Sequence, residues 1–410
     1  MSGAAAQPVG RGFARRHFVT GLGIGQIASW GSLYYAFPLI GEAMSRDLGW
    51  SKVEVFGAAT IGLLLSALLA YPVGAAIDRG HGRLMMAGGS VAAACLLAAW
   101  SQVSSLTAFY AILALIGALQ AAVLYEPAFA VVARRVGPAH ARAGITSLTL
   151  WGGFASTVFV PLVQVLLEHF GWRGALLTLA AVNLVVCAGA YGLVIDRDAD
   201  APPAPRRPTA AGTARRGPLE LALRTPTFWF LCASFTAYAA TFSAFTFHFY
   251  PLLVERGLTT ADVVVAMMVI GPAQVLGRVL VWKLAPLAPV RRIGSVVVVA
   301  FPAALLALDF LPTSFVVAAG VAIVYGLANG IMTIVRGIAV PEMLTREAYG
   351  ALNGALATPG TIAKALAPGA AAILWQASGS YEAVISASIV GSLVLVAGFW
   401  MAAAAARQPR

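Results

Sequence analysis

The chain consists of long apolar segments separated by short polar or charged stretches. A helix needs about 20 mostly apolar residues to cross a bilayer, whereas a transmembrane β-strand alternates apolar and polar residues over about ten positions. The segments do not alternate, so the pattern predicts an all-α membrane protein with twelve transmembrane helices. We place them at residues 18–44, 52–77, 84–102, 105–132, 143–167, 174–195, 226–253, 261–284, 293–311, 314–339, 348–375 and 380–405.

A stretch without periodic apolar positions separates the sixth segment from the seventh. Residues 196–218, DRDADAPPAPRRPTAAGTARRGP, are rich in Pro, Ala and Arg, as is typical of a linker. The segments on its two sides echo each other, and Pro161 and Pro368 occupy matching places. We therefore predict two pseudo-symmetric six-helix bundles, residues 1–195 and 219–410, joined by a cytoplasmic linker. Transporters built from parallel repeats bind substrate between the bundles, near the midplane.

The composition agrees with a chain dissolved largely in lipid. Sixty per cent of the 410 residues are apolar and 10% are charged, whereas about 25% are charged in soluble domains. The 27 Lys and Arg residues exceed the 16 Asp and Glu residues, but they punctuate apolar segments instead of forming a nucleic-acid-binding patch. The three cysteines lie within apolar runs and suit packing better than a metal or disulfides.

The distribution of basic residues predicts the orientation in the membrane. With both termini in the cytoplasm, 20 of the 27 basic residues fall in cytoplasmic segments and four fall outside. This asymmetry satisfies the positive-inside rule. The first apolar segment is too long for a signal peptide, and we expect no cleavage. We therefore expect an integral protein of the cell inner membrane with both termini in the cytoplasm.

Away from the helix ends, four charged residues lie within predicted helices, namely Arg278, Arg336, Lys364 and Glu126. A charge at the bilayer centre costs roughly 3 kcal/mol even on the mildest insertion scales, so such residues usually face the interior and are used there. The planar guanidinium of Arg278 suits a carboxylate because it donates two parallel hydrogen bonds. The alternative is an arginine that extends to the cytoplasmic surface beside Lys283 or bonds to helix carbonyls.

One loop carries a family signature. The sequence GAAIDRGHGRLMM between the second and third predicted helices resembles the signature of the major facilitator superfamily, with Gly74, Asp78, Arg79 and Arg83 in register. The resemblance extends over essentially the whole chain and implies the twelve-helix fold of that superfamily. It also implies that the Asp78 carboxylate lies near the start of the eleventh helix and acts as a conformational lock, with Arg134 or Arg135 as partners.

Finer resemblance points to the branch that contains monocarboxylate transporters and oxalate/formate antiporters. The stretches YYAFPLIGEAM and FGWRGALL are similar to sequences of that branch. The resemblance implies that Arg278 binds a substrate carboxylate and that Lys364 adds a second cation, as in the oxalate antiporters. Gln274 occupies the place of a proton-linked aspartate in monocarboxylate carriers, and Leu39 the place of a lysine.

Further polar residues lie on helices that line the cavity in this fold. Arg336 and Glu126 lie near the cytoplasmic ends of their helices, where a charge pair would close the inner mouth. Glu126 is alternatively a carrier of the coupled proton, and His248 is a second candidate. Aromatic residues at helical spacing more often pack than bind, but the substrate-orienting candidates include Tyr34, Tyr35, Gln120, Tyr238 and Asn329.

These observations favour a secondary carrier of a small organic anion, a mono- or dicarboxylate, that is proton-coupled or exchanges anions by alternating access. The alternative is an exporter of a neutral or amphiphilic drug or metabolite, since few acids lie in the membrane to attract a cation. A non-transporting receptor is more remote, and no nucleotide loop, metal cluster or nucleophile constellation indicates an enzyme or a cofactor. Because twelve helices already enclose a cavity, we expect a monomeric functional unit.

Overall fold

The computed structural model describes residues 9–137, 140–200, 218–285, 287–345 and 348–406, and nearly all of them are helical. Short π-helical segments are labelled η. The first half of the chain forms α1 (Val9–Trp30), η1 (Gly31–Tyr35), α2 (Ala36–Leu48), α3 (Lys52–Ala76), η2 (Ile77–His81), η3 (Leu84–Gly88), α4 (Gly89–Trp100), α5 (Leu106–Val123), α6 (Tyr125–Val136), α7 (Ala141–Gly152), α8 (Ala155–Val182), η4 (Asn183–Cys187) and α9 (Ala188–Val194).

The second half of the chain is also mostly helical. It forms α10 (Pro218–Leu223), α11 (Pro226–Glu255), α12 (Thr260–Met268), α13 (Ile270–Leu284), α14 (Val290–Val297), α15 (Ala300–Phe310), α16 (Phe315–Ala339), η5 (Val340–Leu344), α17 (Tyr349–Ser378) and α18 (Glu382–Ala405). Residues 201–217 of the predicted linker lie outside the described residues. Pro218, which the sequence analysis assigned to the linker, is the first residue of α10, a short helix that was not predicted.

Eight helical stretches among the described residues are long and apolar enough to cross a membrane. The longest, Ala141–Val194, contains two predicted crossings. Gly171 lies between them with φ 64°, in the left-handed region that glycine adopts without steric cost, and so reverses the chain.

Several predicted helices are broken where the sequence analysis expected continuity. Leu124 adopts an extended conformation with ψ −151° and separates α5 from α6. Val269 separates α12 from α13, and residues 298–299 separate α14 from α15. Each break is occupied by apolar residues, so the hydrophobic pattern does not reveal it. Irregular backbone at membrane depth is tolerated where protein or a water-filled cavity surrounds it.

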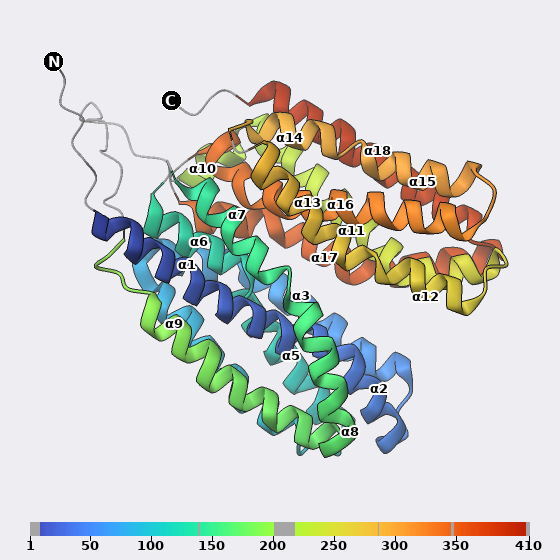
Figure 1. The fold of residues 1–410 in the computed structure, drawn as a ribbon, viewed down its shortest axis with the longest axis horizontal. Coiled ribbons are helices and arrows are strands. Elements are labelled where there is room, and N and C mark those ends of the chain that lie inside the picture. The colour runs from blue at the N-terminus through green and yellow to red at the C-terminus, as the bar shows by residue number, and fades with distance from the viewer. Residues whose placement is uncertain (1–8, 138–139, 201–217, 286, 346–347, 407–410) are drawn as a thin grey trace.

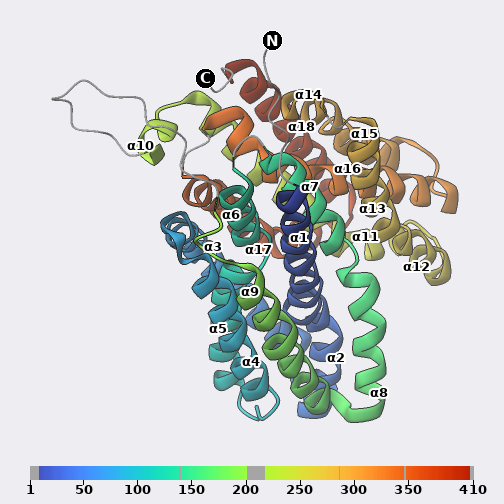
Figure 2. The same ribbon diagram turned by 60° about the vertical axis from the view of Figure 1, so that its left-hand side comes forward.

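Figure 1 shows the first half, in blue to green, and the second half, in yellow to red, as two bundles of helices side by side. The start of α1 and the end of α18 lie near one end of the molecule, which we call the terminal end, and we call the opposite end the distal end. The bundles meet at the terminal end and diverge toward the distal end, and the turned view in Figure 2 shows α17 of the second half close to α3 and α6 of the first.

The closest approach between the halves is the packing of α3 against α17. Gly74 and Gly350 face each other so closely that a Cβ on either would overlap the backbone of the other. Further along the pair, the Thr358 hydroxyl donates to the Ala67 carbonyl at 2.9 Å. Small residues let membrane helices approach closely and gain van der Waals contact. This seam therefore holds the terminal end closed.

A buried polar seam joins α1 to α9 within the first half. The Gln26 amide donates to the Tyr191 hydroxyl at 2.9 Å and to the Val123 carbonyl at 2.7 Å. Ser29 shares the same Tyr191 hydroxyl at 2.9 Å. All three side chains are fully buried. These bonds fix the rotation of α1, which carries the aromatic residues described next.

Candidate functional site

Arg278 is buried on α13, where the two halves meet. Its side chain is 5% exposed, and its Nη1 donates to the Thr149 carbonyl of α7 at 3.2 Å. Its Nε is buried without a partner, and no carboxylate among the described residues forms an ion pair with it. An arginine that reached the membrane surface would be exposed. The guanidinium is therefore an interior cation whose remaining donors face no protein charge of opposite sign.

A glycine makes room for this arginine. Gly153 lies between α7 and α8, and a Cβ added there would overlap Nη1 of Arg278. The sequence analysis did not single out Gly153 or Thr149. The only signal was the glycine pair in the sequence TLWGGF, which by itself indicates close packing without naming a partner.

Four aromatic side chains of the first half gather near Arg278. The Trp30 ring lies 5.2 Å from Tyr34, 6.2 Å from Tyr35 and 4.9 Å from Tyr125 between centroids. Tyr35 and Tyr125 are close enough to Arg278 to interact with it electrostatically. Trp30 was not predicted to belong to the site, and its indole Nε1 is buried without a partner.

Lys364 of α17 faces this aromatic group from the opposite half. Its Nζ lies 4.4 Å from the centre of the Tyr34 ring, which is within the range of a cation–π interaction. No ion pair of Lys364 is found in the described part of the chain. We call Arg278, Lys364, Trp30, Tyr34, Tyr35 and Tyr125 the central cluster.

The backbone around Lys364 is held by α11. Pro368 has no N–H to donate to the Lys364 carbonyl one turn earlier. The Ser243 hydroxyl donates to that carbonyl at 2.7 Å. The Pro368 carbonyl in turn accepts from His248 Nε2 at 2.9 Å. The Ser243 bond thus replaces the helical bond that the proline removes, the His248 bond adds a second tie from α11 to this turn, and together they hold the backbone that carries Lys364.

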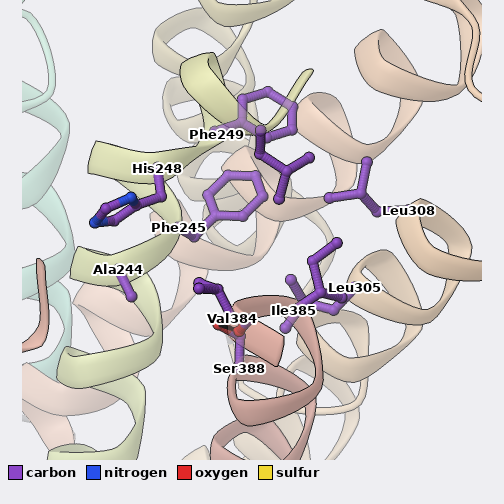
Figure 3. Close-up of a pocket in the computed structure, with 10 residues that line it drawn as sticks. Ala244, Phe245, His248, Phe249, Leu305, Leu308, Val384, Ile385 and Ser388 are labelled. Carbon is purple, nitrogen blue, oxygen red and sulfur yellow. Dashed lines mark hydrogen bonds between the residues drawn. The ribbon is translucent and has the colours of Figure 1, made fainter. Parts of the chain in front are cut away.

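His248 has a further partner on its other ring nitrogen. Its Nδ1 lies 3.1 Å from the Tyr381 hydroxyl. Figure 3 shows the imidazole pointing away from Leu305 and Leu308, on the margin of a small apolar pocket in the second half. Since the Pro368 carbonyl can only accept, Nε2 carries a proton, and Nδ1 of the neutral ring accepts from Tyr381. The described contacts of His248 tie α11 to α17 and to the start of α18.

The other predicted substrate residues are dispersed around the central cluster. Gln120 donates to the Leu33 carbonyl at 2.8 Å, and the buried Asn329 accepts a hydrogen bond from the Tyr238 hydroxyl. Gln274 is half-buried one turn before Arg278 on α13. The structure therefore brings Tyr34, Tyr35, Lys364 and Arg278 into the central cluster. Of the remaining candidates, Tyr238 is also close enough to Arg278 to interact with it electrostatically, and Gln120 lines a cavity together with Tyr34.

An ion pair between the halves lies on the terminal side of Arg278. Glu126, in the first turn of α6, is 3.4 Å from Arg336 in the last turn of α16. The Arg336 guanidinium also lies 5.9 Å from the centre of the Tyr238 ring. Both members of the pair are one-third exposed. Their charges balance each other and leave those of Arg278 and Lys364 unbalanced.

Asp78 joins the two halves at the terminal end. Its carboxylate accepts from the backbone N–H groups of Gly350 at 2.9 Å and Ala351 at 2.8 Å, both in the first turn of α17. The start of a helix presents unpaired N–H groups and a partial positive charge, so a carboxylate is stabilised there. This is the location that the family resemblance implied for Asp78.

The arginines near Asp78 differ from the expected partners. Arg134 donates to the backbone carbonyl of Asp78 and pairs with the Asp200 carboxylate at 3.0 Å. Arg135 donates to the backbone carbonyl of Asp196 at 2.8 Å. Among the described residues neither arginine forms an ion pair with the Asp78 carboxylate, although Arg134 is close enough to interact with it electrostatically. Burial raises the pKa of Asp200, and the neighbouring Arg134 opposes that shift. The side chains of Arg79 and Arg83 are exposed.

A second link between the halves was missed by the sequence analysis. Arg142, at the start of α7, lies 3.4 Å from Glu342 and also donates to the Ala288 carbonyl. Glu342 accepts from the Val290 N–H at 2.8 Å, at the start of α14. Arg142 appeared as one of many surface basic residues, and only the fold brings it to the other half. In the described part of the chain, no three His, Cys, Asp or Glu residues form a potential metal site.

Comparisons with solved structures show the fold. The chain aligns with the human organic anion transporter MFSD10 (TETRAN) at TM-score 0.71 and 16% identity, covering 97% of this chain and 100% of that one. It aligns with the E. coli fucose:proton symporter FucP at TM-score 0.70 and 12% identity, covering 94% of this chain and 98% of that one. At such identities the likeness establishes the fold alone, and it confirms the predicted two-bundle, twelve-helix architecture.

Curated relatives match part of the chain. Human monocarboxylate transporter 11 is 31% identical over 201 residues, which are 47% of this chain and 40% of that protein. Monocarboxylate transporter 13 of Bos taurus is 32% identical over 177 residues, 42% of this chain and 39% of the relative. The aligned regions thus span about two fifths of these relatives. The model of the Major Facilitator Superfamily, a family of transporters and not of enzymes, matches residues 22–368. The chain belongs to the Major Facilitator Superfamily.

Proposed function

We propose that this protein is a secondary active transporter of a small organic anion, a mono- or dicarboxylate, that works by alternating access. The observation that carries the proposal is the buried Arg278, which has one carbonyl partner, an unpaired Nε and no carboxylate partner among the described residues. A buried charge without a partner is strongly unfavourable. A substrate carboxylate that accepts two hydrogen bonds from the guanidinium compensates for that cost.

Lys364 extends the site toward a second negative charge. It lies on the facing side of the central cluster, against Tyr34. Two cations suit a dicarboxylate, whereas a monocarboxylate leaves one charge to be balanced by a coupled anion or by Glu126. Proton coupling through Glu126 requires that its pair with Arg336 opens during the cycle. The charge of the substrate therefore indicates whether the carrier exchanges anions or moves protons.

The relatives support this substrate class. Two of the curated relatives are named monocarboxylate transporters, and one similar solved structure is described as an organic anion transporter. The competing function, export of a neutral or amphiphilic compound, would use the aromatic residues of the central cluster. Export of a neutral compound gives no reason for Arg278 and Lys364, two cations without an ion-pair partner in the described chain, to lie beside those aromatic residues.

The orientation in the membrane and the alternating-access cycle belong to the same proposal. We place the terminal end in the cytoplasm of an inner-membrane protein, because the basic residues concentrate on that side. The Asp78 contacts and the Glu126–Arg336 pair then close the cytoplasmic mouth. Residues 1–195 and 219–410 move as two bodies of one monomeric unit, and Asp78 acts as a lock between them.

Binding measurements on purified protein test the anion site. Isothermal titration with lactate, oxalate and a neutral amphiphile compares the wild type with Arg278→Lys and Lys364→Gln. Because lysine keeps the charge but loses the planar fork, Arg278→Lys is expected to weaken carboxylate binding by about 2 kcal/mol, roughly 30-fold. Lys364→Gln should weaken oxalate more than lactate.

The control is Arg292→Lys, a change at an exposed arginine of α14, which should leave all affinities unchanged. Unchanged carboxylate affinity in both site variants would remove the anion-site proposal. Binding of the neutral amphiphile in preference to both acids would favour the exporter instead.

A further inference from the structure

A side cavity opens beside the central cluster within the first half. It has a volume of about 50 Å³ and lies between η1, α2, α3 and α5. Its lining includes Tyr34, Phe37, Ala59, Leu63, Ile116 and Gln120. Since about 10–15 Å³ of such volume holds one water molecule, the cavity accommodates roughly three to five groups of that size.

Seven of the nine residues that line the cavity are apolar, and the other two are Tyr34 and Gln120. The amide of Gln120 is its main polar group, and that amide already donates to the Leu33 carbonyl at 2.8 Å. Pro38 has no N–H to donate back to the π-helical turn that contains Leu33, so Gln120 serves the backbone there. An apolar cavity of this size is not a favourable place for water, which needs two to four polar partners.

Tyr34 connects the cavity to the charged part of the site. It lines the cavity, and Lys364 Nζ lies 4.4 Å from the centre of its ring. It also packs edge-on against Trp30 and Tyr35, at 5.2 and 5.4 Å between centroids. A ligand whose anionic end lies between Lys364 and Arg278 thus has an apolar cavity next to that end.

We infer that this cavity receives the aliphatic tail of the substrate, so that the protein selects short-chain carboxylates by tail length. The inference rests on the proposed anion site and adds the tail, about two to four carbons long from the cavity volume. Tyr34 borders both a cation and a mostly apolar cavity, a combination that matches a molecule charged at one end and apolar at the other.

The test measures the affinity of unbranched monocarboxylates of two to eight carbons by isothermal titration. In the wild type, affinity should rise about fourfold for each CH₂ that enters the cavity and then level off. Ala59→Leu fills the cavity and should abolish the rise, leaving acetate nearly unaffected. Leu63→Ala enlarges it and should extend the rise by one or two carbons. Leu68→Ala is the matched control on α3, because Leu68 is 64% exposed and does not line the cavity.

The outcomes separate this inference from the anion site. An Arg278-dependent affinity for carboxylates that is flat with chain length, or that rises equally in the wild type and Ala59→Leu, overturns the tail cavity and leaves the anion site standing. A parallel series of primary amides, which carry no negative charge, tests the tail cavity independently of the anion site. If amides bind as well as acids and still show the length dependence that Ala59→Leu removes, the anion site fails and the tail cavity is supported.

Discussion

The charged residues within the membrane-spanning helices divide by whether the protein neutralises them. Glu126 and Arg336 face each other, and a pair that is partly exposed contributes little net stability. Arg278 and Lys364 have no such partner in the described chain. The cost of burying Arg278 is met in part by the Thr149 carbonyl. Its remaining donors make it the residue whose environment changes most when an anion arrives.

The position of the Arg278 guanidinium depends on the absence of a side chain at Gly153. Gly153→Ala should lower carboxylate affinity about tenfold, because an added methyl group in a packed site costs about 1–3 kcal/mol and 1.4 kcal/mol is a factor of ten. Gly320→Ala is the matched control, since a Cβ there has no neighbour within 4 Å. Titration of one carboxylate against both variants is sufficient. Equal affinities would show that the arginine has room to move aside.

Sequence reasoning identified the site residues that differ chemically from their surroundings. Arg278, Lys364 and Glu126 stand out because charges are rare in apolar segments. Trp30 and Gly153 do not stand out, because tryptophan and glycine are ordinary residues of membrane helices. Their roles depend on which surfaces the fold brings together.

At the scale of the helix, α17 carries both the contact with Asp78 and Lys364 of the central cluster. Its first turn donates to Asp78, and Lys364 lies 14 residues beyond Gly350, about 21 Å along the axis at 1.5 Å per residue. The apolar pattern predicted the position of this helix, since the expected 348–375 compares with Tyr349–Ser378. The pattern could not predict the break at Leu124, because extended and helical leucines are equally apolar.

The contact of Asp78 with α17 can be weakened without touching the central cluster. Asp78→Asn keeps the shape but removes the charge at the helix start, which is worth about 0.3–2 kcal/mol. We expect the equilibrium to shift up to about 30-fold toward opening of the terminal end, with slower turnover and nearly unchanged substrate binding. Reaction rates of single cysteines placed at the terminal end would report the shift. Equal losses of binding and turnover in a folded protein would contradict a lock.

At the scale of the whole molecule, two links hold the terminal end closed. One joins α3 to α17 through Asp78, and the other joins α7 to the second half through Arg142 and Glu342. They join different helix pairs and therefore resist opening at different places on the same interface. That two bundles would form was predictable from the repeat, but the second link was not, since it joins residues 200 positions apart.

Because the Asp78 and Glu342 contacts share no described partner, their effects on the closed state should be independent. The double variant Asp78→Asn, Glu342→Gln is expected to shift the opening equilibrium by the product of the two single shifts, within about 0.5 kcal/mol. Distances between spin labels at the terminal ends of α3 and α17 would give the populations. A double variant no more open than either single variant would mean that one link already controls the interface.

Pro368 affects the rigidity of α17. The Ser243 hydroxyl occupies the Lys364 carbonyl that the proline leaves free, and the His248 imidazole bonds to the Pro368 carbonyl. Side-chain hydrogen bonds within membrane proteins average about 0.6 kcal/mol, close to the thermal energy at room temperature. A single such bond makes this turn of α17 easier to deform than a regular helical turn. We therefore expect α17 to flex at Pro368, which would move the segment beyond the proline relative to Lys364 and to the segment fixed to Asp78.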